Sequence, residues 1–108
     1  MADLTMKEAI QKFIDAFVED GGNKNSKTSM NGYYVGITDD LERRSKEHNA
    51  TFLYSVKAKT KEDAVELEDE LGELGFDNGD RPGNGAKDDT VNIYIYKKTK
   101  DTKEHITN

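Results

Sequence analysis

Four residues in the middle of the chain have the side-chain types that phosphate chemistry uses: Tyr34, Arg44, His48 and Glu68. Hydrolysis of a phosphodiester requires a base that activates water and a cation that neutralises charge on the scissile phosphate, and a carboxylate usually anchors a divalent metal ion. Arg44 and His48 are four residues apart, so on a helix they share one face. The chain has no cysteine and only two histidines. This composition excludes disulfide scaffolds and thiolate metal sites and leaves no credible Ser-His-Asp triad.

Glu68 differs from the other carboxylates of its predicted helix, which begins at Thr60 or Lys61 and ends at Gly75. The apolar stripe of that helix consists of Ala64, Leu67, Leu71 and Leu74. At 100° per residue, Glu68 lies about 40° from Ala64 and about 60° from Leu71, whereas the other carboxylates point away. A buried charge without compensation is costly. The position of Glu68 therefore favours a functional carboxylate.

The first element is an amphipathic helix, because apolar residues between Met6 and Val18 recur with a period of 3.6. Thr5 and Glu8 fit a capping box, and the glycines 21 and 22 end the helix. The polar residues 23–31 are typical of a linker.

Alternating apolar residues predict three strands, over 33–38, 52–59 and 90–97. Between the first two we expect a surface helix over 39–47, capped by Thr38, with Leu41 as its only large aliphatic residue. Residues 77–89 are rich in glycine and predict a loop. The fold class is a small α+β domain: a three-stranded, mainly antiparallel sheet with three helices. One domain spans 1–108, with an N-terminal helix in 1–22, a linker in 23–31, a core in 32–98 and a frayed tail in 99–108.

The net charge of −6 is unevenly distributed along the chain. Residues 41–61 carry six basic and two acidic side chains, whereas residues 62–89 carry two basic and eleven acidic ones. The basic residues Arg43, Lys57 and Lys59 therefore lie where a nucleic-acid backbone could bind, although few cations imply weak non-specific affinity. No apolar run is long enough to cross a membrane, and no signal peptide is recognisable, so we expect a cytoplasmic protein without membrane contact.

Residues 34–44, which read Tyr-Val-Gly-Ile-Thr-Asp-Asp-Leu-Glu-Arg-Arg and continue to Glu47 and His48, resemble the second half of the GIY-YIG nuclease signature. In that family a helix reading Leu-Glu-Arg-Arg follows the motif strand, with a histidine just beyond. Residues 64–68 resemble the helix that holds the family's metal-binding glutamate. The resemblance covers residues 33–75 and continues more weakly to residue 98.

The resemblance implies a role for each of these residues. Tyr34 would be the general base or a phenol that orients water, and Arg44 would clamp the phosphate and the transition state. Glu68 would be the sole ligand of Mg²⁺ or Mn²⁺, and His48 would support the site. The activity implied is that of a metal-dependent endonuclease acting on DNA or RNA.

This chain departs from the family in two places. The family's first strand should precede Tyr34, where residues 23–29 cannot form one, and Ser45 stands where such helices usually bury an aliphatic residue. The last predicted strand alternates tyrosine and isoleucine, with Tyr94 and Tyr96 on one face. We expect this strand to fill the missing place by pairing with the first one, so that Tyr94 and Tyr34 meet beside Arg44.

Two other functions remain open on the same scaffold. One is a catalytically inactive module that binds nucleic acid through Arg43, Arg44, Lys57 and Lys59. The other is a protein-interaction or inhibitor protein, in which the acidic helix face between Glu62 and Glu73 meets a basic partner or mimics nucleic acid.

Overall fold

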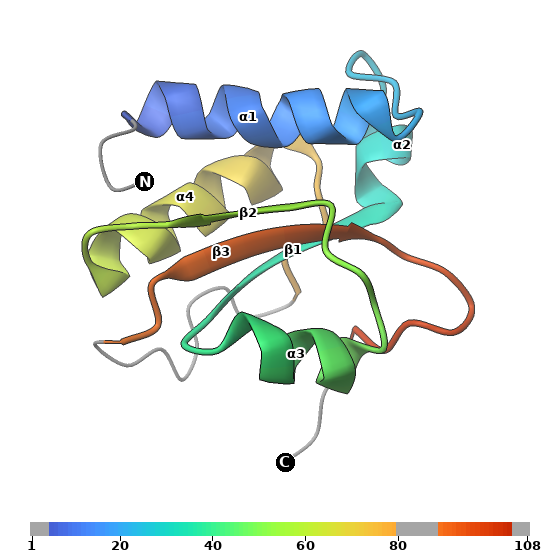
Figure 1. Cartoon of the computed structure of the whole chain (residues 1–108). Helices are drawn as coiled ribbons and strands as arrows, with labels where there is room; N and C mark the ends of the chain where they lie inside the picture. The colour runs from blue at the N-terminus through green and yellow to red at the C-terminus, as the bar shows by residue number, and fades with distance from the viewer. Residues whose placement is uncertain (1–4, 80–88, 105–108) are drawn as a thin grey trace.

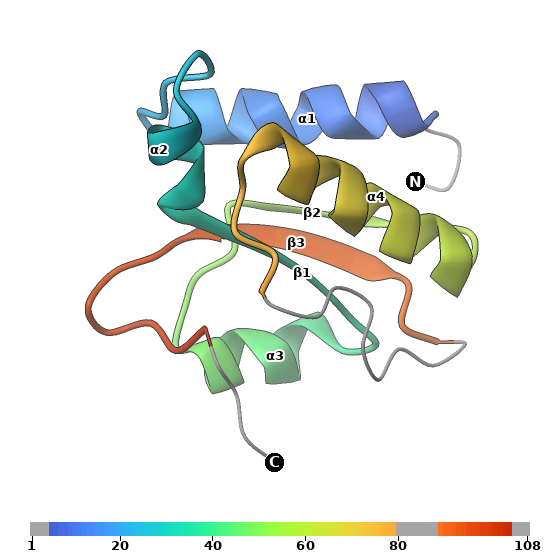
Figure 2. The same cartoon turned by 180° about the vertical axis from the view of Figure 1, so that it is seen from behind.

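The computed structural model describes residues 5–79 and 89–104, and these residues form three layers (Figure 1). The long helices α1 (Met6–Glu19) and α4 (Lys61–Leu74) cover one face of a sheet, and α3 (Leu41–His48) lies on the other face, as Figure 2 shows from behind. The sheet consists of β1 (Tyr33–Thr38), β2 (Tyr54–Lys57) and β3 (Asn92–Lys97), and the short helix α2 (Lys27–Asn31) precedes β1. The predicted small α+β fold is thereby confirmed, with four helices among the described residues in place of three.

The last strand of the chain lies at the centre of the sheet, whose order is β1-β3-β2 with both pairings antiparallel. Tyr34 is opposite Tyr96 and Gly36 is opposite Tyr94. The expected pairing of the first and last strands is therefore correct. It places residues far apart in the sequence on neighbouring strands.

The hydrophobic core lies between the sheet and the pair α1 and α4. Val35, Ile93 and Ile95 are buried there, because alternate residues of a strand point to the same face. Aromatic residues of α1 close the layer through edge-to-face contacts: Phe13 packs on Tyr54 with ring centroids 5.0 Å apart. The predicted capping box of α1 is present, since Thr5 and Glu8 each accept a hydrogen bond from the other's backbone.

Two local predictions differ from the structure. The expected linker 23–31 contains α2, a single turn capped by Ser26 that buries Met30. Helix α3 is capped by Asp40, not Thr38: the Asp40 carboxylate accepts from the Arg43 amide at 3.0 Å. The Thr38 hydroxyl, which is buried at the end of β1, accepts instead from the Asp40 amide.

The predicted tail and loop are only partly within the described residues. Residues 99–104 do not fray but hydrogen-bond to the end of α3, where the Lys103 amide donates to the His48 carbonyl at 2.7 Å. Residues 105–108 and 80–88 lie outside the described part of the chain. At the start of the predicted loop, Asp77 runs parallel to the edge of β1 and exchanges backbone hydrogen bonds with Tyr33 and Val35. Within 5–79 and 89–104, no helix is long and apolar enough to cross a bilayer.

Candidate active site

The sheet face that α3 covers carries three tyrosines in two neighbouring strands. The register of β1 and β3 places Tyr34, Tyr94 and Tyr96 on this face, with Tyr34 opposite Tyr96 and Gly36 opposite Tyr94. A Cβ at Gly36 would overlap the Tyr94 hydroxyl and lie 2.6 Å from its ring carbon Cζ. Glycine is therefore required here so that the Tyr94 ring can lie across β1.

His48, at the end of α3, lies among these rings and is 2% exposed. Its Nε2 is 2.7 Å from the Tyr94 hydroxyl, and its Nδ1 is 2.6 Å from the carbonyl oxygen of Lys103. A carbonyl oxygen can only accept, so Nδ1 carries the proton, and in the neutral ring Nε2 then accepts from Tyr94. Burial lowers the pKa of His48, which favours this neutral form.

Aromatic packing surrounds this polar pair. The His48 ring lies 5.2 Å from the Tyr34 ring and 5.0 Å from the Tyr96 ring. Phe52 stacks on Tyr94 with centroids 4.2 Å apart. These contacts explain how α3 packs on the sheet although Leu41 is its only large aliphatic residue. The His48 ring fills the place that aliphatic side chains take in other amphipathic helices.

Arg44 lies on the same side of the sheet as His48 and is partly buried. One guanidinium nitrogen, Nη1, is 3.2 Å from Glu47 Oε1, while Nε is buried without a hydrogen-bond acceptor among the described residues. A buried donor without an acceptor costs free energy, and an anionic oxygen would satisfy it. The neighbouring Arg43 is exposed and forms an ion pair with Asp39 at 2.6 Å.

Glu68 is the one carboxylate of α4 that is buried, at 4% exposure, as its angular position predicts. Its charge acts on the tyrosines of the opposite sheet face, raising the pKa of both Tyr34 and Tyr94. The Asn78 side chain donates to the Glu68 backbone carbonyl at 3.3 Å, which ties the chain beyond α4 to this point. The chain after α4 is thus bonded to Glu68 through Asn78 and to the edge of β1 through Asp77.

Tyr34 is half-buried, whereas Tyr94 and Tyr96 on the same face are buried. Burial is the largest cause that raises its pKa to about 12, and the charges of Glu68 and Asp77 add to it, while Arg44 opposes them. Burial also raises the pKa of Tyr94 strongly, and there too Arg44 opposes and Glu68 adds. Both phenols are therefore protonated at neutral pH. Tyr34, Arg44, Glu68 and Tyr94 share one electrostatic environment.

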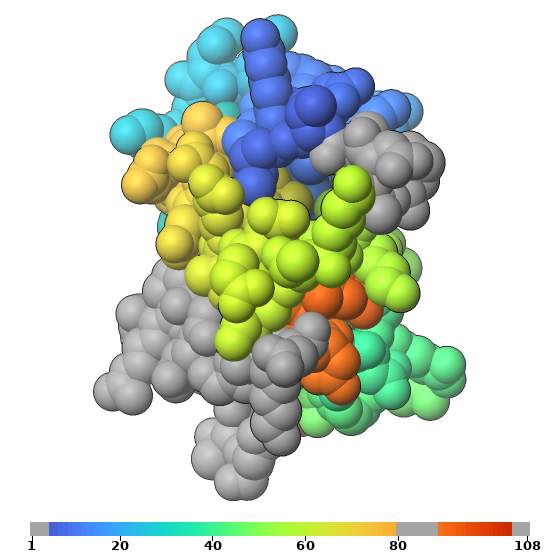
Figure 3. Space-filling view, turned by 90° about the vertical axis from the view of Figure 1, so that its left-hand side faces the viewer, coloured from blue at the N-terminus to red at the C-terminus, as the bar shows by residue number. Residues whose placement is uncertain are grey.

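The two lysines of the predicted nucleic-acid site lie apart from these residues. Lys57 ends β2 and is exposed, and β3 separates β2 from the strand that carries Tyr34. Lys59 follows in the exposed connection to α4. Figure 3 shows this end of the molecule, where the start of β3 is visible between the β2–α4 connection and α3. The structure thus brings Tyr34, Arg44, His48, Glu68 and Tyr94 together and leaves Lys57 and Lys59 at the end of the sheet.

Three further participants were not predicted as site residues: Phe52, Tyr96 and Glu104. Tyr96 donates to Glu104 Oε2 at 3.0 Å and lies 3.1 Å from His48 Nδ1. The alternation that identified Tyr94 also places Tyr96 on this face, so a signal for Tyr96 was present in the sequence. Glu104 lies in the predicted tail, where no periodicity marks a contact.

Several carboxylates act on the groups of this site, Glu68 and Asp77 on Tyr34 and Glu47 on His48, but among the described residues they do not gather into a metal cage. Within 5–79 and 89–104 there is no group of three or more histidine and carboxylate side chains that could hold a metal ion. Mg²⁺ is commonly bound through one or two carboxylates together with substrate phosphates and water. The donor set therefore fits an ion that binds together with a phosphate and does not fit a metal cage built by the protein alone.

No known protein family, no curated protein and no solved structure matches this chain.

Proposed function

We propose that this protein is a GIY-YIG-type endonuclease that hydrolyses phosphodiester bonds in DNA or RNA, in the cytoplasm. The observation that carries the proposal is the contact of Tyr34 with the Tyr94–His48 pair, on which the charges of Arg44 and Glu68 also act, from four separate elements of the fold. A cation, a carboxylate and a proton acceptor are groups that phosphodiester hydrolysis uses.

Arg44 is the group that would bind the scissile phosphate. Its Nε lacks an acceptor among the described residues, and Nη1 lies 3.2 Å from Glu47 Oε1, so the Nε side of the guanidinium is left for a phosphate oxygen. Arginine binds phosphate through two parallel N–H groups, which lysine cannot reproduce. Arg44 would thus hold the phosphate in the ground state and offset the charge that develops in the transition state.

Tyr94 and Tyr34 would have different roles toward the attacking water: Tyr94 would accept its proton, and Tyr34 would orient it. Tyr94 has a proton acceptor in place, because its hydroxyl donates to His48 Nε2 at 2.7 Å. In the proposed step a water oxygen attacks phosphorus and its proton passes to the Tyr94 oxygen. The Tyr94 proton passes to Nε2, and the leaving oxygen takes a proton from solvent. Tyr34, half-buried and protonated, would orient the water. His48 becomes an imidazolium; burial and Arg44 lower its pKa, while the hydrogen bond to Lys103 and the charges of Glu104 and Glu47 partly offset this.

Glu68 would hold Mg²⁺ or Mn²⁺, and the ion when bound would polarise the phosphate oxygens. The carboxylate itself acts on the phenols through space, since its charge raises the pKa of Tyr34 and Tyr94. A cation beside Glu68 would therefore also ease proton loss from these phenols.

A cleavage assay with matched variants tests the proposal. Fluorescently labelled single-stranded, duplex and branched DNA and an RNA oligonucleotide are incubated with the full chain in Mg²⁺, in Mn²⁺ or in EDTA. We expect metal-dependent cleavage that falls by about 10²-fold or more in Arg44→Ala, the scale for loss of a group that stabilises the transition state. Glu68→Gln should abolish cleavage while the protein stays folded. Lys46→Ala is the control for Arg44→Ala. Lys46 is an exposed cation on α3, the helix of Arg44, and it forms an ion pair with Glu42 at 3.4 Å.

The same assay distinguishes the other functions. Binding that weakens with salt, without cleavage, would make the protein a nucleic-acid-binding module. No binding to any of these substrates at low salt would refute both and leave the interaction with a basic protein through the acidic face of α4.

A further inference from the structure

The end of the described chain folds back onto the proposed active site. We call residues 99–104 the C-terminal turn. Its Lys103 forms a reciprocal pair of hydrogen bonds with His48: the Lys103 amide donates to the His48 carbonyl at 2.7 Å, and His48 Nδ1 donates to the Lys103 carbonyl at 2.6 Å. Next to it, the Asn49 side chain donates to the Asp101 carbonyl at 3.1 Å. Asn49 is the left-handed residue that ends α3, so the turn is attached to α3 at two successive residues.

Glu104 adds a second constraint on His48, which acts through Tyr96. Its Oε2 accepts from the Tyr96 hydroxyl at 3.0 Å and contacts the Thr102 hydroxyl at 2.6 Å. A phenol has one proton to donate. Because Tyr96 gives this proton to Glu104, its oxygen presents a lone pair to His48 Nδ1, which is 3.1 Å away.

Both contacts favour the same protonation of the imidazole. The Lys103 carbonyl and the Tyr96 oxygen both act as acceptors toward Nδ1, so the ring proton lies on Nδ1 and Nε2 is left to accept. In the alternative tautomer, the Nδ1 lone pair would face the Lys103 carbonyl oxygen, and Nε2–H would donate to Tyr94. The Tyr94 proton would then have no acceptor on His48.

We propose that the C-terminal turn is part of the active site, with Lys103 and Glu104 as positioning residues that fix His48 in the tautomer able to take the proton of Tyr94. This inference rests on the proposed function, in which that proton is transferred. It predicts that a substitution of Glu104 changes catalysis through the imidazole and not through substrate binding.

The first measurement is the tautomer itself, read from the ¹⁵N resonances of the imidazole nitrogens. His105→Gln serves as the background, because it leaves His48 as the only histidine of the full chain. In this background the unprotonated nitrogen should be Nε2. In Glu104→Ala the Tyr96 proton is released and competes for Nδ1, so a measurable fraction should shift to the other tautomer. Glu104→Gln keeps an acceptor oxygen and should restore the original one.

Two further variants test the route of the effect. Asp101→Ala is the matched control, since it removes an exposed carboxylate from the same turn and keeps the Asp101 backbone carbonyl that accepts from Asn49. Tyr96→Phe removes the competing donor, so Glu104→Ala should no longer shift the tautomer in that background. Thermal unfolding of each variant identifies any loss of folding, and the Tyr96→Phe pair keeps the test informative if Glu104→Ala alone is unstable.

The second measurement is the rate of cleavage. We expect Glu104→Ala to lower kcat about tenfold with little change in KM, a part of the 10²–10⁴-fold that general acid–base catalysis contributes. An unchanged tautomer in a folded Glu104→Ala would overturn the inference, whether or not the protein cleaves nucleic acid. A shifted tautomer with unchanged kcat would also overturn it. If the tautomer shifts but the protein cleaves no substrate, the turn does fix the protonation of His48, and the proposed function is refuted.

Discussion

Gly36→Ala is the substitution whose consequence follows most directly from the geometry of the sheet. Gly36 lies in β1 opposite Tyr94, and an added Cβ would overlap the Tyr94 hydroxyl and approach its Cζ to 2.6 Å. The ring cannot move freely, because Phe52 stacks on it at 4.2 Å and its hydroxyl is bonded to His48. The methyl group must therefore displace Tyr94, bend β1 or both.

The cost has two parts. Overpacking of a well-packed site costs about 1–3 kcal/mol. If the Tyr94 ring moves, His48 Nε2 loses its donor in a buried setting, which costs about 1–3 kcal/mol more. The two costs do not add fully, because a movement of the Tyr94 ring that breaks its hydrogen bond also relieves the overpacking. We therefore expect the free energy of unfolding to fall by about 2–4 kcal/mol, measured by denaturant titration with circular dichroism.

Ser55→Ala is the matched control for this measurement. Ser55 faces Tyr94 from β2 as Gly36 does from β1, so it tests the same neighbour from the other side. Replacing its small side chain by another adds no atom, and we expect a change within about 0.5 kcal/mol. If Gly36→Ala were as mild as Ser55→Ala, the Tyr94 ring would not lie across β1, and the Tyr94–His48 pair would lose its structural basis.

Three other predictions follow from the same structure. The free energy of unfolding should fall steeply above about pH 10. Burial raises the pKa of Tyr34 to about 12 and raises that of Tyr94 further, whereas both phenols have a pKa near 10 in the unfolded chain. Their protonated forms therefore stabilise the fold below about pH 10, and this contribution is lost as the pH rises toward the pKa values of the folded protein. Tyrosinate absorbance and circular dichroism should change together in that range; independent titration of the phenols before unfolding would contradict it. Thr5→Ala should lower stability by about 1 kcal/mol in thermal or denaturant unfolding, because it removes the cap of α1; no change would mean that the first turn of α1 contributes nothing to the fold. Nucleic-acid binding, measured by fluorescence anisotropy against salt, should have a logarithmic slope of about −1, as a single phosphate contact from Arg44 requires; a slope near −3 would indicate that Lys57 and Lys59 bind the same strand.

The elements that carry a periodic signal were predictable from the sequence. The alternation around Tyr94 predicted the strand, and the helical angle of Glu68 predicted its burial. These predictions succeed because strand and helix periodicity decide which side chains share a face. The pairing with the strand of Tyr34 was expected from the family resemblance, because the first strand of that family has no counterpart before Tyr34.

The parts that were missed depend on backbone groups or on single side chains. Helix α2 is one turn long and buries only Met30, so it has no periodic pattern to detect. The bond that fixes His48 comes from the carbonyl of Lys103, and every residue has a carbonyl. Thr38 and Asp40 are both good caps, and which of them caps α3 is decided by where β1 ends.

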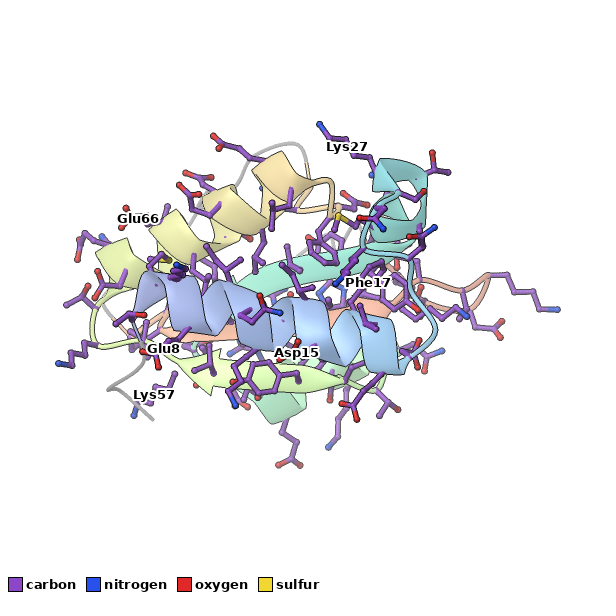
Figure 4. The ribbon with its side chains drawn as sticks, turned by 90° about the horizontal axis from the view of Figure 1, so that it is seen from above. Glu8, Asp15, Phe17, Lys27, Lys57 and Glu66 are labelled. Atoms are coloured by element: carbon purple, nitrogen blue, oxygen red, sulfur yellow. The ribbon has the colours of Figure 1, made fainter. Side chains whose placement is uncertain are left out.

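The structure changes how the acidic composition bears on a nucleic-acid substrate. The carboxylates of α4 other than Glu68 are exposed on its outer side, as Glu66 is in Figure 4, and α4 lies across the sheet from α3. A polyanion would therefore meet the least repulsion on the side of α3, where Arg44 is. On that side Arg43 pairs with Asp39 and Arg44 pairs with Glu47, but Arg44 keeps a buried Nε without an acceptor among the described residues, which makes it the main attraction near the phenols. Binding strength would then come from one guanidinium and the metal site of Glu68 more than from a basic surface. Substitution of Arg44 or of Glu68 should therefore lower the rate of cleavage more than it changes the salt dependence of nucleic-acid binding.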